Sequence, residues 1–130
     1  MLGLAVLAVA GCRHTTHSAA KQPQADEGLL EQAYATEKDI IAAYDNAIAA
    51  ATGDTTALMS QRDAHATHLA ALDLSISVQP TRAILTMRQL PAFLTESVDA
   101  LRSAAVSATD GNHAAVFASI AAAHQVSGHE

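Results

Sequence analysis

The chain has 130 residues, half of them apolar and only 3% aromatic, and its formal net charge is −6. This length suits a single domain, and an apolar content dominated by alanine favours closely packed helices around a core of modest stability. Acidic residues outnumber basic ones and no basic cluster occurs. This argues against nucleic-acid binding, because phosphate contacts need clustered positive charge.

An apolar run near the start of the chain ends in the only cysteine. The run covers residues 2–10, carries no charge and leads through Val9, Ala10 and Gly11 into Cys12. Small residues before a cysteine at the end of an apolar run resemble a bacterial lipobox, at which the thiol is diacylated and the peptide is cut. We therefore expect residues 1–11 to be a lipoprotein signal peptide. Cys12 would then anchor the protein to the cell membrane on its extracytoplasmic face.

Two alternatives to this interpretation remain open. No Lys or Arg precedes the run, whereas a signal peptide has a basic n-region. Either the true start codon lies upstream, or the segment is a frayed apolar N-terminus with an incidental cysteine. The run is too short for a membrane-spanning helix, which needs about 20 apolar residues. The single cysteine also excludes an intramolecular disulfide.

Residues 12–28 are predicted to form a flexible tether after the lipidated cysteine. The segment is polar, lacks periodicity and contains Pro23. His14 and His17 lie in it, and we interpret them as solvated side chains rather than as metal ligands.

Two amphipathic helices are predicted next. The first covers about residues 29–51 and ends before Gly53, and the second is capped by Thr55 or Thr56 and ends near Leu72. Apolar residues at three- and four-residue steps give each helix one inward face. These faces consist of Leu30, Tyr34, Glu37, Ile41, Tyr44 and Ile48 in the first helix, and of Leu58, His65, His68, Leu69 and Leu72 in the second.

Two further helices are predicted in the second half of the chain. Pro80 bars a continuous helix over residues 73–89, of which residues 81–88 are a candidate short helix. The third main helix should start near Pro91, and Asp110 or Asn112 should cap the fourth. Residues 128–130 are expected to fray. The inward faces consist of Leu94, Val98, Leu101 and Ala105 in the third helix, and of His113, Phe117, Ile120 and His124 in the fourth.

Four amphipathic helices predict an all-α four-helix bundle over residues 29–127. The connection between helices 2 and 3 is long, at about seventeen residues, and could span about 55 Å if extended, more than the length of a 20-residue helix. We therefore predict two antiparallel hairpins joined by one long link, which is the ferritin-like connectivity.

Polar side chains on the inward faces are the candidate functional residues. Glu37 interrupts the apolar face of the first helix, and a buried carboxylate must be paired, protonated or bound to a cation. His65 and His68 lie one turn apart on the second helix, and His124 lies on the inner face of the fourth. Because neutral imidazole binds transition metals, these four residues are a tentative site for a single metal ion.

Structural interpretations compete with this metal site. Glu37 could hydrogen-bond a histidine across the core. His65 and His68 could be partly exposed and bonded to water, Asp63 or Asp73. His113 is interpreted as an ordinary residue of the first turn of its helix.

Four stretches of the chain resemble a known family. They are ATEKDIIAAYDNAIAA (residues 35–50), RDAHATHLAAL (62–72), LTESVDALRSAA (94–105) and VFASIAAAH (116–124). They are similar to actinobacterial lipoproteins with a ferritin-like domain, over about residues 29–127. Iron-binding ferritin-like proteins place a Glu on each of two helices and Glu-x-x-His on each of the other two. By this resemblance Glu37 matches the first Glu and His68 matches a histidine ligand, whereas His65 stands where a Glu would be.

The other two helices depart further from that ligand pattern. Glu96 is the weaker candidate ligand on the third helix, and it lies off the apolar stripe. On the fourth helix His124 and Ser127 replace the Glu and the His of the pattern. The resemblance therefore implies a degenerate di-iron ligand set, with a single metal ion or none.

We expect a bacterial envelope lipoprotein that is a non-enzymatic binding or structural module. The sequence contains no Gly-rich phosphate loop, no G-x-S-x-G and no H-E-x-x-H. The alternative is a metal-binding or redox protein that holds Zn, Cu or Fe through its inward Glu and His residues. Haem binding is least favoured, because alanine-rich faces leave little room for a macrocycle.

Overall fold

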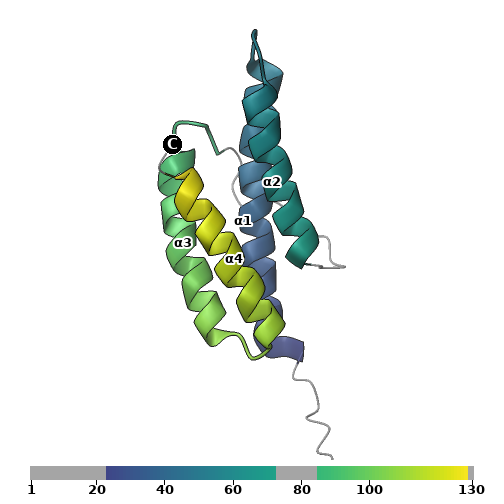
Figure 1. Ribbon diagram of the computed structural model, residues 1–130, viewed down its shortest axis with the longest axis vertical. Coiled ribbons are helices and arrows are strands. Elements are labelled where there is room, and N and C mark those ends of the chain that lie inside the picture. The colour runs from purple at the N-terminus through teal and green to yellow at the C-terminus, as the bar shows by residue number, and fades with distance from the viewer. Residues whose placement is uncertain (1–22, 73–84, 129–130) are drawn as a thin grey trace, which may run out of the picture.

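The computed structural model describes residues 23–72 and 85–128, which form four α-helices (Figure 1). They are α1 (Pro23–Ala50), α2 (Thr56–Leu72), α3 (Leu90–Ser107) and α4 (Gly111–Ser127). No strand occurs in this part of the chain, so the all-α prediction is confirmed. None of these four helices is long and apolar enough to cross a membrane. The predicted signal peptide, the predicted lipidation site Cys12 and residues 129–130 lie outside the described residues.

α1 begins at Pro23 rather than near Leu29, so residues 23–28, which we assigned to the tether, are helical. Proline suits the first turn of a helix, because it has no N–H to leave unpaired and its φ is already helical. Asp26 lies in this first turn, where a carboxylate interacts favourably with the helix dipole. The other helix ends agree with prediction to within about two residues, which is the usual variation in helix assignment.

Short side-chain caps explain where α2 and α4 begin. The Asp54 carboxylate accepts hydrogen bonds from the backbone N and the hydroxyl of Thr56, at 2.9 and 2.6 Å, so Asp54 rather than the predicted Thr55 or Thr56 supplies the capping side chain of α2. Asp110 accepts one from the backbone N of Asn112 at 2.7 Å, so of the two expected caps Asp110 is the one used. The expected short helix over residues 81–88 is wrong for residues 85–88, which are not helical. Residues 81–84 lie outside the described part of the chain.

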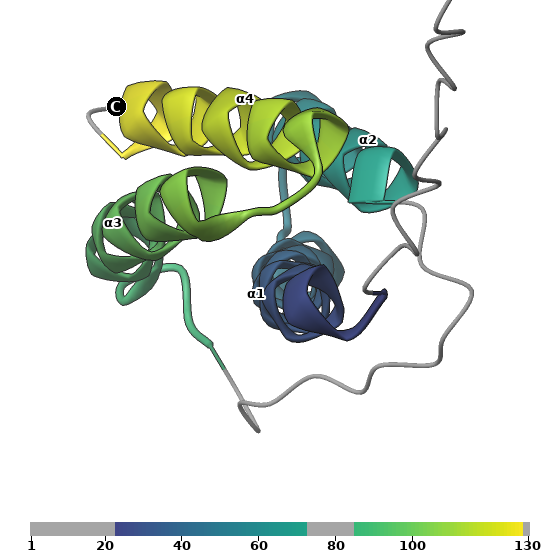
Figure 2. The ribbon, with the colours of Figure 1, turned by 90° about the horizontal axis from the view of Figure 1, so that it is seen from below.

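The helices form two hairpins, α1 with α2 and α3 with α4, packed side by side (Figure 1, Figure 2). Each hairpin is antiparallel, whereas α2 and α3 run in the same direction (Figure 1). The C-terminal ends of both α2 and α3 therefore reach the same core cluster, through Leu72 and Leu101. α3 starts at the opposite end of the bundle from the residue where α2 ends. Residues 73–84 of this connection are not described.

The apolar core of the described residues is divided into two clusters. The first contains Leu30, Ala33, Leu72, Leu101, Ala104, Phe117, Ile120 and Ala121. The second contains Ile40, Ala43, Tyr44, Leu85, Leu90 and Leu94. The predicted inward faces are largely confirmed, but Ile40 rather than Ile41 is fully buried on α1. Between the clusters along α1 lies Glu37, with only 1% of its surface exposed.

Candidate metal centre

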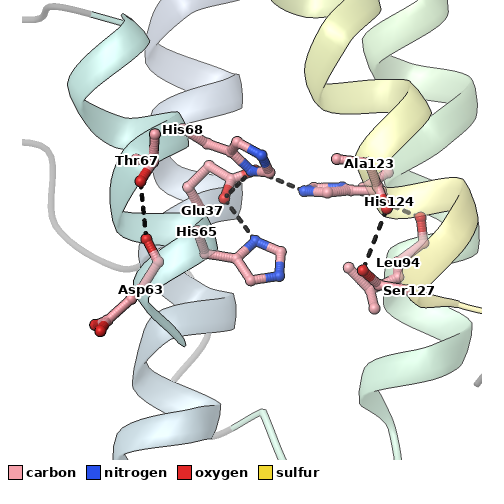
Figure 3. A network of polar contacts seen from close by, with 10 residues as sticks. Glu37, Asp63, His65, Thr67, His68, Leu94, Ala123, His124 and Ser127 are labelled. Atoms are coloured by element: carbon pink, nitrogen blue, oxygen red, sulfur yellow. Dashed lines mark hydrogen bonds and ion pairs between the residues drawn. The ribbon is translucent and has the colours of Figure 1, made fainter. Parts of the chain in front are cut away.

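The structure brings four of the predicted site residues together in the middle of the bundle (Figure 3). Glu37 comes from α1, His65 and His68 come from α2, and His124 comes from α4. Each offers one ligand atom, and these atoms all lie within 4.8 Å of one another. Three histidines that lie 28 to 87 residues after Glu37 in the sequence therefore converge with it on one point.

The Glu37 carboxylate is the centre of this cluster. Its Oε2 lies 2.8 Å from Nδ1 of His65 and 3.3 Å from Nδ1 of His68. Its Oε1 lies 2.7 Å from Nε2 of His124. The side chains of Glu37, His65 and His124 are at most 2% exposed, whereas that of His68 is 18% exposed. The cluster is thus closed to solvent except on the side of His68.

The contact between Glu37 and His124 differs from the other two. Although Oε1 and Nε2 are 2.7 Å apart, their geometry is not that of a hydrogen bond, and neither atom has a hydrogen-bond partner among the described residues. Leaving two buried polar atoms unsatisfied costs free energy. The pair therefore needs a proton or a cation to join it.

The other ring nitrogen of His124 is held by α3. Its Nδ1 lies 2.6 Å from Oγ of Ser97, and the Ser97 hydroxyl donates to the backbone carbonyl of Leu94 at 2.7 Å. Ser97 is itself buried, with 6% of its surface exposed. All four helices thus contribute a side chain to the centre or to its support.

Aromatic contacts hold the imidazole rings in place. The Tyr44 ring stacks on His65 with a centroid distance of 5.7 Å and an interplanar angle of 28°. The three histidine rings lie 5.2 to 5.7 Å from one another, measured between centroids. With Tyr44 packed behind it, His65 has little freedom to turn away from Glu37.

The electrostatics of the cluster favour an ionised carboxylate. Burial raises the pKa of Glu37, but the contacts with His124, His65 and His68 outweigh burial and hold the pKa below its ordinary value of 4.5. A buried anion surrounded by three imidazoles is an arrangement that can accept a positive charge.

The remaining predicted site residues lie elsewhere. Glu96, the weaker candidate ligand, is exposed and lines an open surface hollow with Arg88 and Phe93, because its neighbour Ser97 takes the inward position on α3. The Ser127 hydroxyl donates to the backbone carbonyl of Ala123 at 3.2 Å and does not join the cluster. Cys12 is outside the described residues.

A second polar cluster, at Asp26, escaped prediction. The Asp26 carboxylate accepts hydrogen bonds from the backbone N of Thr109 and of Asp110, at 2.8 and 2.9 Å, and from the Thr109 hydroxyl at 2.9 Å. It also lies 2.9 Å from Nδ1 of His113, which is therefore more than an ordinary first-turn residue. These contacts tie the start of α1 to the turn between α3 and α4. We had assigned Asp26 to the flexible tether, and nothing in the sequence indicated contacts with residues more than 80 positions away.

Comparisons of the chain with protein-family models, with curated proteins and with solved structures found no match.

Proposed function

We propose that this bundle binds a single divalent transition-metal ion through Glu37, His65, His68 and His124. The observation that carries the proposal is the buried contact between Glu37 Oε1 and His124 Nε2, at 2.7 Å and without hydrogen-bond geometry. A metal ion bound by both atoms would satisfy both of them at once. A proton would satisfy this pair alone, whereas a metal ion would also engage the ligand atoms of His65 and His68.

The chemistry of the donor set indicates which ions fit. Three imidazole nitrogens and one carboxylate oxygen suit Zn, Cu, Fe and Ni better than Mg or Ca, which prefer oxygen ligands alone. Four protein ligands complete a tetrahedral site, which is the usual form of a structural zinc site. We therefore name Zn²⁺ as the first ion to test, and a site without an open coordination position favours a binding role over catalysis.

We further propose that the bundle has ferritin-like connectivity. The support is the shared direction of α2 and α3, together with the start of α3 at the opposite end of the bundle from the residue where α2 ends (Figure 1). Ferritin-like di-iron sites use carboxylates from several helices. The cluster here has one carboxylate, Glu37, and Glu96 lies on the exposed face of α3. This ligand set supports one metal ion rather than a di-iron centre.

We propose, from the sequence alone, that the bundle works at the bacterial envelope. The support is the lipobox-like run that ends at Cys12. In this proposal the protein is a lipid-anchored, non-enzymatic module that holds a metal ion at the extracytoplasmic face of the cell membrane.

Zinc titration of the metal-free full-length chain tests the metal proposal. We expect one Zn²⁺ per chain, and loss of this binding in the double variant His65→Ala with His68→Ala and in Glu37→Gln. Glu96→Gln is the matched control, since it removes a carboxylate from the exposed face of α3 and should bind zinc as the wild type does. Sub-stoichiometric zinc, or zinc uptake unchanged in the double variant, would contradict the proposal. Cobalt and copper titrations, read by their absorption bands, then rank the metals.

A further inference from the structure

Ser97 contacts the one ring nitrogen of His124 that does not face Glu37. Its Oγ lies 2.6 Å from Nδ1, while Nε2 of the same ring lies 2.7 Å from Glu37 Oε1. Serine is not a usual metal ligand, so the sequence pointed to the neighbouring Glu96 as the candidate ligand on α3. Ser97 is nevertheless buried beside the His124 ring, with 6% of its surface exposed.

The direction of these hydrogen bonds follows from the groups involved. The backbone carbonyl of Leu94 can only accept, so the Ser97 hydroxyl must use its single proton to donate to it, at 2.7 Å. The Ser97 oxygen is then left as an acceptor for His124, and the Nδ1 of His124 must carry the proton that it donates. In a neutral imidazole the other nitrogen, Nε2, consequently holds a lone pair.

We propose that Ser97 is a positioning residue that fixes His124 in the Nδ1–H tautomer and so directs the Nε2 lone pair into the metal site. The inference rests on the proposed metal binding and deepens it. A metal-ligating histidine commonly donates its second N–H to a neighbouring oxygen, and losing that partner lowers metal affinity about 10- to 100-fold. Here the neighbouring oxygen belongs to α3, the one helix that supplies no ligand of its own.

This tautomer also accounts for the unsatisfied pair in the cluster. With Nδ1 protonated, Nε2 carries a lone pair that can bind a cation, and the neighbouring Glu37 Oε1 has no hydrogen-bond partner among the described residues. A metal ion bound by both atoms would satisfy both of them. The contact with Ser97 thus leaves Nε2 of His124 as a metal ligand rather than a hydrogen-bond donor.

Nitrogen-15 NMR of the histidine rings in the metal-free full-length chain tests the inference directly. We expect the Nδ1–H tautomer of His124 in the wild type at neutral pH, and a shift toward the Nε2–H tautomer in Ser97→Ala. Zinc affinity should fall about 10- to 100-fold in that variant. Ser97→Thr keeps the hydroxyl and should retain the wild-type tautomer and zinc affinity, and a cavity of about 20 Å³ lined in part by Ser97, Ala33 and Ala104 leaves space beside this position.

The outcomes separate this inference from the proposal on which it rests. An Nε2–H tautomer or an imidazolium in the metal-free wild type would overturn the inference even if zinc binds. An unchanged zinc affinity in Ser97→Ala would also overturn it. If the wild type shows the expected tautomer but binds no Zn²⁺, the metal proposal itself fails, and Ser97 then has no ligand to position.

Discussion

Nε2 of His124 lies 2.7 Å from Oε1 of Glu37 and bridges the two hairpins of the bundle. Glu37, His65 and His68 belong to the α1–α2 hairpin, whereas His124 alone belongs to the α3–α4 hairpin (Figure 3). The cluster therefore has three members in one hairpin and one in the other. The two hairpins pack on each other less extensively than the two helices within each hairpin do. An ion held at this point would link both hairpins.

Replacing Glu37 with glutamine should separate metal binding from folding. The amide keeps an oxygen for His65 and can donate from its NH₂ group to Nε2 of His124, so the unfolding free energy of the metal-free protein should change by about 1 kcal/mol or less. Zinc at 100 times its Kd should stabilise the wild type by about 2.7 kcal/mol. This gain should vanish in Glu37→Gln, because the uncharged amide is a poor ligand. Thermal unfolding with and without zinc measures both effects, and a zinc-dependent gain that survives in the variant would contradict the assignment.

Truncating the two histidines of α2 should have unequal effects on folding and similar effects on metal binding. His65 is 2% exposed and stacks on Tyr44, so His65→Ala should cost about 2–4 kcal/mol of stability. His68 is 18% exposed, so His68→Ala should cost about 1 kcal/mol or less. Both variants should lose tight zinc binding, since each removes a ligand.

Urea unfolding of the metal-free variants and zinc titration of the same samples measure these two quantities. Equal destabilisation by the two substitutions would show that the difference in burial has no energetic effect. Zinc affinity retained in His68→Ala would remove the more exposed histidine from the ligand set.

Asp26 should make the fold sensitive to acid. Hydrogen bonds from Thr109, and then from His113 and Asp110, hold the pKa of Asp26 well below its ordinary value of 3.8. The unfolded chain therefore binds a proton at a higher pH than the folded chain does. The stabilisation is fully present above the ordinary pKa and is lost as the pH falls below it.

The variant Asp26→Asn should lower the Tm at neutral pH and reduce the further loss of Tm between about pH 5 and about pH 3. Glu31→Gln is the matched control, because Glu31 is an exposed carboxylate on the same helix. Thermal unfolding over this pH range compares the three proteins. If Asp26→Asn and the wild type lose the same Tm on acidification, the contacts of Asp26 are not what makes the fold sensitive to acid.

Cys12 should carry the lipid anchor. Radiolabelled or alkyne-tagged fatty acid fed to a bacterial host that expresses the full-length chain should label the wild type, and Cys12→Ser should abolish the label. Membrane fractionation of the same two strains should move the variant out of the membrane fraction. Label incorporated equally by both proteins would rule out this cysteine as the acylation site.

Helical periodicity identified the four residues that the structure brings together. Glu37 lies three residues after Tyr34 and four before Ile41, and His65 and His68 lie one turn apart, so their spacing placed them on inward faces. The same rule placed His124 one turn after Ile120. The spacing within each helix therefore identified the inward residues, whereas their meeting at one height depends on how the helices pack.

The residues that support the cluster could not be found in this way. Ser97 is polar and does not contribute to the apolar periodicity of α3, and its partner His124 is 27 residues away. Asp26 lies in a polar stretch that resembles a linker, and its partners, on the turn before α4 and in the first turn of α4, are 83 to 87 residues away. Contacts over such distances depend on how the hairpins pack, which the periodicity of a single helix does not encode.

The position of the polar cluster between two apolar clusters has a consequence for how the helices align. Alanine-rich faces are nearly smooth, so helices that carry them can slide past one another by a turn with little change in contact area. Glu37 has partners on both α2 and α4 at fixed heights, and a slide of one turn, about 5.4 Å, would separate it from all of them. The contacts of Glu37 therefore fix the register of the helices. They select a single alignment from several that the apolar residues alone would tolerate.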